Sequence, residues 1–219
     1  MKRKNGLKVL IKRIFIVLVV TISVVNSNPL FAQKNDKDDF GMWFVAQMTK
    51  NWDNGLYIAM RGEFRTKEMG GKMDITYLRP TFGYAPLKWL KIDVAYDIML
   101  LSSGALRHDF LFSVTGTLSK ENLSVSVRER YMLAYNQKEK TYTNVIRSFL
   151  RAQYKAGCCT PYLALEIFSW SKWNMTQYFV GTEIAFAKHS SFDIFYMYNS
   201  YASKPQAQHT AGLGYLLKL

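Results

Sequence analysis

The chain has 219 residues, of which 49% are hydrophobic and 15% aromatic, and its formal net charge is +13. After the first thirty residues, no apolar run reaches the length of about 20 residues that a membrane-spanning helix needs. The sequence shows no motif that binds RNA or DNA, so the charge alone does not indicate a nucleic-acid partner.

Residues 1–32 have the pattern of a secretory signal peptide. Six basic residues precede an apolar stretch over 14–25, the breaker Asn28-Pro29 follows, and we expect cleavage after Ala32 or Ser27. Loss of this segment leaves 23 of the 29 basic residues against 16 acidic ones, a net charge of +7. The alternative is an uncleaved anchor before a soluble domain. Residues 33–40 form a polar lead-in, and we predict a single domain over 41–219.

Apolar and polar residues alternate with a period of two in most of that domain, which is typical of β-strands. The pattern is clearest over 90–101, where one face carries Leu90, Ile92, Val94, Tyr96, Ile98 and Leu100. Turn signals separate eleven such segments: 41–50, 56–67, 74–84, 90–101, 107–118, 123–135, 142–154, 162–171, 175–187, 192–201 and 208–219. One strand of this kind also fits a soluble sandwich. Eleven of them behind a signal peptide predict an all-β transmembrane antiparallel β-barrel of about 10–12 strands. The parity stays open, because single-chain bacterial barrels have even numbers.

Compact and looser connections alternate along the chain, as expected for short periplasmic turns and longer outer loops. The compact connections lie near residues 51, 85, 119, 157 and 188, and the looser ones near 68, 102, 136, 171 and 202. Aromatic residues gather at segment ends, which predicts two interfacial girdles. Trp52 and Trp89 lie by compact turns, and Trp170, Trp173, Tyr178, Tyr135, Tyr142 and Tyr201 lie by loops.

With the apolar faces in lipid, the other faces line a lumen that contains seven basic and seven acidic groups. These are Arg61, Glu63, Arg65, Arg79, Asp93, Asp97, Asp109, Arg128, Arg130, Arg147, Arg151, Glu166, Glu183 and Asp193. A buried charge is costly unless it is paired, so the balance predicts a salt-bridged, hydrated plug. The alternative is a polar pore or solute site in which arginines select anions. Asp93 and Asp97 are about 13 Å apart along a strand, too far for a catalytic carboxylate pair.

Glu129 interrupts an otherwise apolar face that includes Val127 and Tyr131. We expect a β-bulge there, because a bulge re-aims one side chain.

His108 is the candidate for a catalytic residue. It shares the lipid-side face with Phe110, and Ser102 or Ser103 is near in sequence. A base beside a serine is what an outer-leaflet lipid hydrolase or acyltransferase needs. An interfacial histidine without a catalytic role fits the same position.

No residue spacing predicts a metal site or a cofactor. His189 and His209 lack ligand spacing, and the adjacent Cys158 and Cys159 read as turn residues, since neighbouring cysteines rarely form a disulfide.

The last segment ends as Gly214-Tyr215-Leu216-Leu217-Lys218-Leu219. It resembles the C-terminal signal by which the barrel assembly machinery takes up outer-membrane barrels. It departs from that signal in ending on Leu219 rather than an aromatic residue and in having Gly212 where a polar residue is usual. The barrel assembly machinery and outer-membrane lipid are therefore the expected partners.

Short motifs in a fixed order carry a wider resemblance over 41–219. They are Trp43, Glu-Phe-Arg at 63–65, Tyr-Leu-Arg-Pro at 77–80, Tyr84, Arg-His at 107–108 and Arg-Glu-Arg at 128–130. In these the chain resembles a family of Gram-negative outer-membrane barrels known only as a domain of unknown function. The resemblance implies a barrel and brings no activity to transfer.

The function we predict is that of a non-catalytic outer-membrane barrel, serving as a narrow or plugged pore or as a structural element. The alternatives are the lipid-modifying enzyme and a barrel that binds a ligand or partner through its outer loops. The oligomeric state is left open.

Overall fold

The computed structural model describes residues 38–202 and 206–219, apart from the side chains of Lys172 and Trp173. The predicted signal peptide and residues 33–37 of the lead-in lie outside this part of the chain. The described residues form eleven strands, at nearly the bounds that the alternation predicts. They are β1 (Asp39–Asn51), β2 (Leu56–Lys67), β3 (Lys72–Leu87), β4 (Leu90–Leu101), β5 (Leu106–Lys120), β6 (Leu123–Asn136), β7 (Thr141–Tyr154), β8 (Cys159–Trp170), β9 (Lys172–Ala187), β10 (Ser190–Tyr201) and β11 (Gln208–Lys218).

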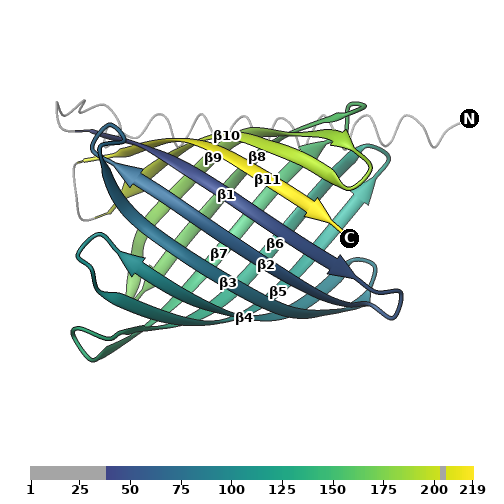
Figure 1. Cartoon of the computed structure of the whole chain (residues 1–219). Helices are drawn as coiled ribbons and strands as arrows, with labels where there is room; N and C mark the ends of the chain where they lie inside the picture. Colours follow the sequence, from purple (N-terminus) through teal and green to yellow (C-terminus); the bar gives the residue numbers. More distant parts are fainter. Residues whose placement is uncertain (1–37, 203–205) are drawn as a thin grey trace, which may run out of the picture. The chain divides into compact units, whose positions relative to one another are not determined.

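The strands close into one barrel in which sequence neighbours pair antiparallel (Figure 1). β1 and β11 complete the ring as a parallel pair, with Asp39 opposite Gln208 and Thr49 opposite Lys218. An odd number of strands joined by hairpins leaves the first and last strands pointing the same way. The parallel pair is therefore the geometric consequence of eleven strands. In the described part of the chain, the number of strands is odd.

The connections fall at two ends of the barrel. What we call the turn end has the connections 52–55, 88–89, 121–122, 155–158 and 188–189. The loop end has 68–71, 102–105, 137–140, residue 171, and residues 202 and 206–207 of the connection after β10. The expected looser loop near residue 171 is wrong: Ser171 alone joins β8 to β9, with a positive φ of 64° that permits the tight reversal.

Alternate residues point to opposite faces of the wall. On β4, Asp93 and Asp97 are buried, whereas Val94 and Ile98 are 52% and 45% exposed. Phe110 on β5 and Val180 on β9 extend this exposed apolar surface around the barrel. An apolar exterior of this extent is typical of a lipid-facing wall. The described residues contain no helix long and apolar enough to cross a membrane.

Glycines on the inner face make room for aromatic rings. A Cβ on Gly212 would lie 2.1 Å from Cζ of Phe195, and one on Gly83 would lie 2.2 Å from Cζ of Tyr57. The ring of Phe195 thus covers the position where the assembly signal usually has a polar residue. This contact gives Gly212 a packing role.

The bulge expected at Glu129 is wrong. Residues of β6 pair without a register shift with β5 and with β7, so that Glu129 lies opposite Val114 and Ser148. Instead, the Ser148 hydroxyl donates a hydrogen bond of 2.8 Å to Glu129 Oε2. The carboxylate on the outer wall is satisfied by a neighbouring strand, so the strand keeps its regular register.

Candidate functional site

The barrel lumen contains two cavities. The turn-side chamber, of about 560 Å³, reaches from the middle of the barrel to Asn51 and Lys218. The loop-side chamber, of about 430 Å³, reaches to Glu139 and Trp170. Tyr77, Arg79 and Arg147 line both chambers, so the two cavities meet at these side chains.

The structure places the fourteen charged residues of the predicted lumen on the inner wall. Ten of them line the turn-side chamber: Arg61, Glu63, Arg79, Asp93, Arg128, Arg130, Arg147, Arg151, Glu166 and Asp193. Arg65 and Asp109 line the loop-side chamber. The other two pair with lining residues, Asp97 with Arg79 and Glu183 with Lys218.

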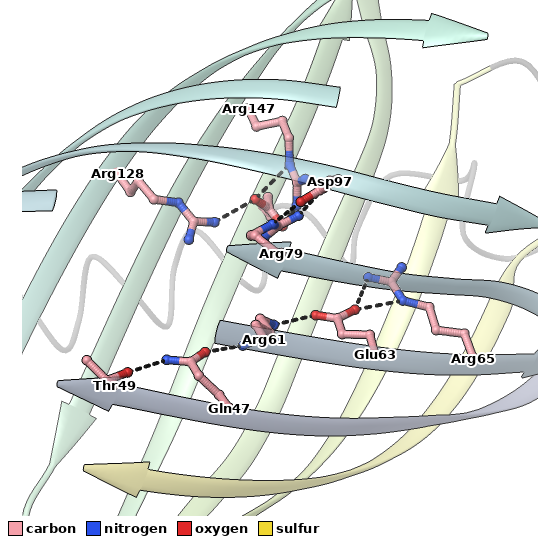
Figure 2. A network of polar contacts seen from close by, with 10 residues as sticks. Gln47, Thr49, Arg61, Glu63, Arg65, Arg79, Asp97, Arg128 and Arg147 are labelled. Atoms are coloured by element: carbon pink, nitrogen blue, oxygen red, sulfur yellow. Dashed lines mark hydrogen bonds and ion pairs between the residues drawn. The ribbon is translucent and has the colours of Figure 1, made fainter. Parts of the chain in front are cut away.

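An ion pair occupies the place where the chambers meet. Arg79 donates from Nε and Nη2 to the two oxygens of Asp97, at 2.5 and 2.6 Å (Figure 2). The Arg79 guanidinium also lies 4.9 Å from the ring centre of Tyr77. This bidentate geometry fixes the orientation of Arg79 in the lumen.

Glu166 on β8 joins two further arginines at the same level. Arg128 Nη2 donates to Glu166 Oε1 at 2.9 Å, and Arg147 Nη2 donates to Oε2 at 3.0 Å. Arg79 on β3 interacts electrostatically with Arg128 on β6, so charged side chains from distant strands converge here. We call Tyr77, Arg79, Asp97, Arg147 and Glu166 the central layer.

A second chain of hydrogen bonds follows β1 and β2 (Figure 2). Glu63 accepts from Arg61 at 2.5 Å and from Arg65 at 2.8 Å, and Arg61 donates onward to Gln47 at 2.9 Å. Glu63 is 4% exposed, which two flanking arginines make tolerable.

Sequence reasoning missed the aromatic wall of the turn-side chamber, which consists of Trp43, Phe149, Tyr162, Phe179 and Phe195. Trp43 packs edge-on against Phe195, with ring centres 5.2 Å apart. The parity of β1 could have indicated this, because Trp43 shares a face with Gln47 and Thr49. Trp170, expected in the outer girdle, instead lines the loop-side chamber, as its parity with Glu166 requires. Lys91 and Lys218 of the turn-side chamber were also missed.

His108 lies on the outer wall, where its Nδ1 is 2.8 Å from the hydroxyl of Tyr96. Ser102 accepts a hydrogen bond from Lys67 at 2.9 Å, and Ser103 accepts one from the Ala105 amide at 3.4 Å. Within the described part of the chain, neither serine forms a hydrogen bond with His108, so no nucleophile–base pair is assembled around it.

The remaining candidates show no ligand constellation. Cys158 is an exposed turn residue and Cys159 begins β8; both thiols are free. His209 Nε2 is 3.6 Å from Asp38. Across residues 38–202 and 206–219, no group of three or more His, Cys, Asp and Glu side chains could hold a metal ion.

A closed barrel with an apolar exterior and a charged lumen defines the chain as a transmembrane β-barrel. Over residues 40–210 the sequence matches the family described as "Protein of unknown function (DUF2490)", and the chain belongs to that family.

Two solved porin structures are similar to this chain. The structure titled NanC porin is 16% identical, with a TM-score of 0.57 over 83% of this chain and 99% of that one. The KdgM porin is 11% identical, with a TM-score of 0.47 over 74% of this chain and 92% of that one. At such identity the likeness to NanC speaks for the fold alone. Comparison with curated proteins gave no match.

Proposed function

We propose that the protein is an integral outer-membrane barrel of a Gram-negative bacterium that provides a narrow, charge-lined passage for small solutes, restricted by the central layer. The observation that carries this proposal is the meeting of the two chambers at Tyr77, Arg79 and Arg147. The lumen is hollow on both sides of this layer. The passage is therefore narrowest where Arg79 is held by Asp97.

Three features support a location in the outer membrane. The exposed face of the wall is apolar, as contact with outer-membrane lipid requires. The sequence begins with a predicted Sec-type signal peptide. The C-terminal strand resembles the signal for the barrel assembly machinery, which we propose as the folding partner.

Fractionation of cells and gel electrophoresis test the location. We expect the mature protein in the outer-membrane fraction, and we expect it to migrate differently on a gel before and after boiling, because a closed barrel resists detergent until it is heated. Recovery in the soluble periplasmic fraction would contradict the proposal.

Conductance in planar bilayers tests the passage. We expect small, steady single-channel currents from the full-length mature barrel. The double variant Arg79→Ala with Asp97→Ala should raise the conductance several-fold, because it removes both halves of the pair that fills the constriction. Glu139→Ala at the rim of the loop-side chamber is the matched control and should leave the current nearly unchanged. A large wild-type current that the double variant does not alter would contradict a restricting layer.

A further inference from the structure

The turn-side chamber holds more positive charge than its own acids neutralise. Eight basic residues and four acidic residues line it. Two of the basic residues, Arg79 and Lys218, form ion pairs with Asp97 and Glu183, which do not themselves line the chamber. Even with these acids included, the chamber keeps an excess of two positive charges. Lys91 and Lys218 are exposed, so the buried part of this positive charge belongs to the arginines. A buried charge is costly without a counter-charge.

The positive charge of the chamber is least compensated at Arg130. The residue is buried, with 6% of its surface exposed, and its Nε donates to the Ser113 hydroxyl at 2.8 Å. Its Nη1 has no hydrogen-bond partner among the described residues. Arg128, Arg79 and Arg147 repel its charge, and the attraction of Glu166 is smaller than each of these repulsions. Arg130 is thus a buried cation that its surroundings compensate only in part.

Strand register produces this crowding. On the inner face, Arg128 and Arg130 are two residues apart on β6, and Arg130 lies directly opposite Arg147 on β7. Like charges directly opposite each other on neighbouring strands are destabilising. The single carboxylate of Glu166 serves Arg128 and Arg147, and leaves Arg130 without an acid. By contrast, Arg61, Arg65, Arg79 and Arg107 each form an ion pair with a carboxylate.

Three other residues that line the same chamber also carry a buried N–H donor without a partner. Arg128 Nε, Arg151 Nε and the indole Nε1 of Trp43 are buried and have no hydrogen-bond partner in the described part of the chain. All three residues line the turn-side chamber, as Arg130 does. Each of these atoms is an N–H donor, so they favour a ligand that is rich in acceptors.

The aromatic wall adds a second requirement. Arg128 lies 4.8 Å above the ring of Phe149, and Phe149 packs against Phe179, with ring centres 6.4 Å apart. The ring centre of Phe179 lies 6.2 Å from that of Trp43. The unpaired donors and the apolar surface therefore belong to one cavity, whose volume of about 560 Å³ is ordinary for a small-molecule site.

We propose that the turn-side chamber binds a small organic anion, with its carboxylate or phosphate group held by Arg128, Arg130 and Arg151 and its apolar part against Phe149 and Phe179. This inference deepens the proposed function and rests on it, because the same lumen is taken as the path of the solute. The anion supplies the acceptors that the chamber's donors lack. The ring surface favours an organic anion over free inorganic phosphate.

Calorimetric titration of the full-length mature barrel in detergent tests the site. The probes are benzoate, phenyl phosphate, inorganic phosphate and the neutral benzyl alcohol. We expect benzoate or phenyl phosphate to bind more tightly than both inorganic phosphate and benzyl alcohol. The tighter of the two aromatic anions identifies the acidic group that the site prefers. The proposal would be overturned if neither benzoate nor phenyl phosphate bound more tightly than benzyl alcohol.

Two variants assign the binding to the chamber. Arg130→Gln can still bond to Ser113 but lacks the charge, and it should weaken binding of the aromatic anion about ten- to hundredfold. Arg151→Gln should weaken it in the same direction. The matched control is Arg107→Gln in the loop-side chamber, where Arg107 already pairs with Asp109 at 2.7 Å, and it should leave the affinity unchanged. The heat-dependent gel shift verifies that each variant is folded.

Unchanged affinity in both Arg130→Gln and Arg151→Gln would overturn the site. Because binding is measured without a membrane, its result is separate from that of the conductance experiment. Binding without conductance would support the anion site and contradict the passage. Conductance without binding would support the passage and contradict the anion site.

Discussion

Arg79 and Asp97 form a bidentate ion pair at the middle of the lumen, with two hydrogen bonds of 2.5 and 2.6 Å between β3 and β4. Asp97 is 1% exposed and Arg79 is 8% exposed, so neither charge is solvated by bulk water. The pair links two neighbouring strands at the boundary of the two chambers. It therefore bears on both the stability of the barrel and the width of the passage.

Asp97→Asn should lower the free energy of unfolding by about 3–5 kcal/mol, because it leaves Arg79 buried without its counter-charge. Equilibrium unfolding in guanidinium, followed by the gel shift, measures the change. Asp53→Asn in the exposed turn after β1 is the control and should have little effect. Replacing both partners, as Arg79→Met with Asp97→Leu, should recover part of the loss, and a double variant as unstable as the single one would refute the explanation.

Glu166 is the one carboxylate that Arg128 and Arg147 share, and its loss should change ion selectivity. In Glu166→Gln the two arginines keep their positive charges, so the passage should prefer chloride over potassium more strongly than in the wild type. The measurement is the reversal potential across a salt gradient. Glu139→Gln at the loop-end rim should shift it less, and an equal shift in both variants would argue against selectivity at the central layer.

The alternation of residues predicts the strands and their inner and outer faces well, since a period of two is a local property of the sequence. It places Arg79, Asp97 and the other lumen charges on one side of the wall. It does not say which charges meet, because pairing across the lumen depends on strand register and on the number of strands. Arg130 illustrates this, since only the register of β6 with β7 sets it opposite Arg147.

The aromatic wall escaped prediction for a related reason. Aromatic residues near strand ends suit both an interfacial girdle and a lumen, and only parity counted from a fixed inner residue separates the two. Trp170 and Trp43 both follow the inward parity of their strands. The space for such rings comes from glycines on neighbouring strands, a relation between residues distant in sequence that no local pattern reveals.

Gly212→Ala should destabilise the barrel by about 1–3 kcal/mol, because the new methyl group would overlap the ring of Phe195. Unfolding in guanidinium measures the effect. Gly116→Ala on β5 is the control, since no atom lies within 4 Å of its added Cβ. Phe195→Leu in the Gly212→Ala background should restore part of the stability, and the absence of any rescue would show that the ring is not the obstacle.

An arginine on the outer wall tests whether that wall faces lipid. Val94 is 52% exposed in the middle of β4, and Val94→Arg should destabilise the barrel in phospholipid vesicles by about 2–4 kcal/mol, the cost of a charge near the bilayer midplane. Leu118, 76% exposed near the turn end of β5, is the depth control: Leu118→Arg should cost about 0–1 kcal/mol, because its side chain reaches the interface. Reversible unfolding followed by tryptophan fluorescence gives both values. If the outer wall faced water instead, both arginines would be tolerated equally, so a large difference between the two positions is the signature of a membrane-spanning barrel.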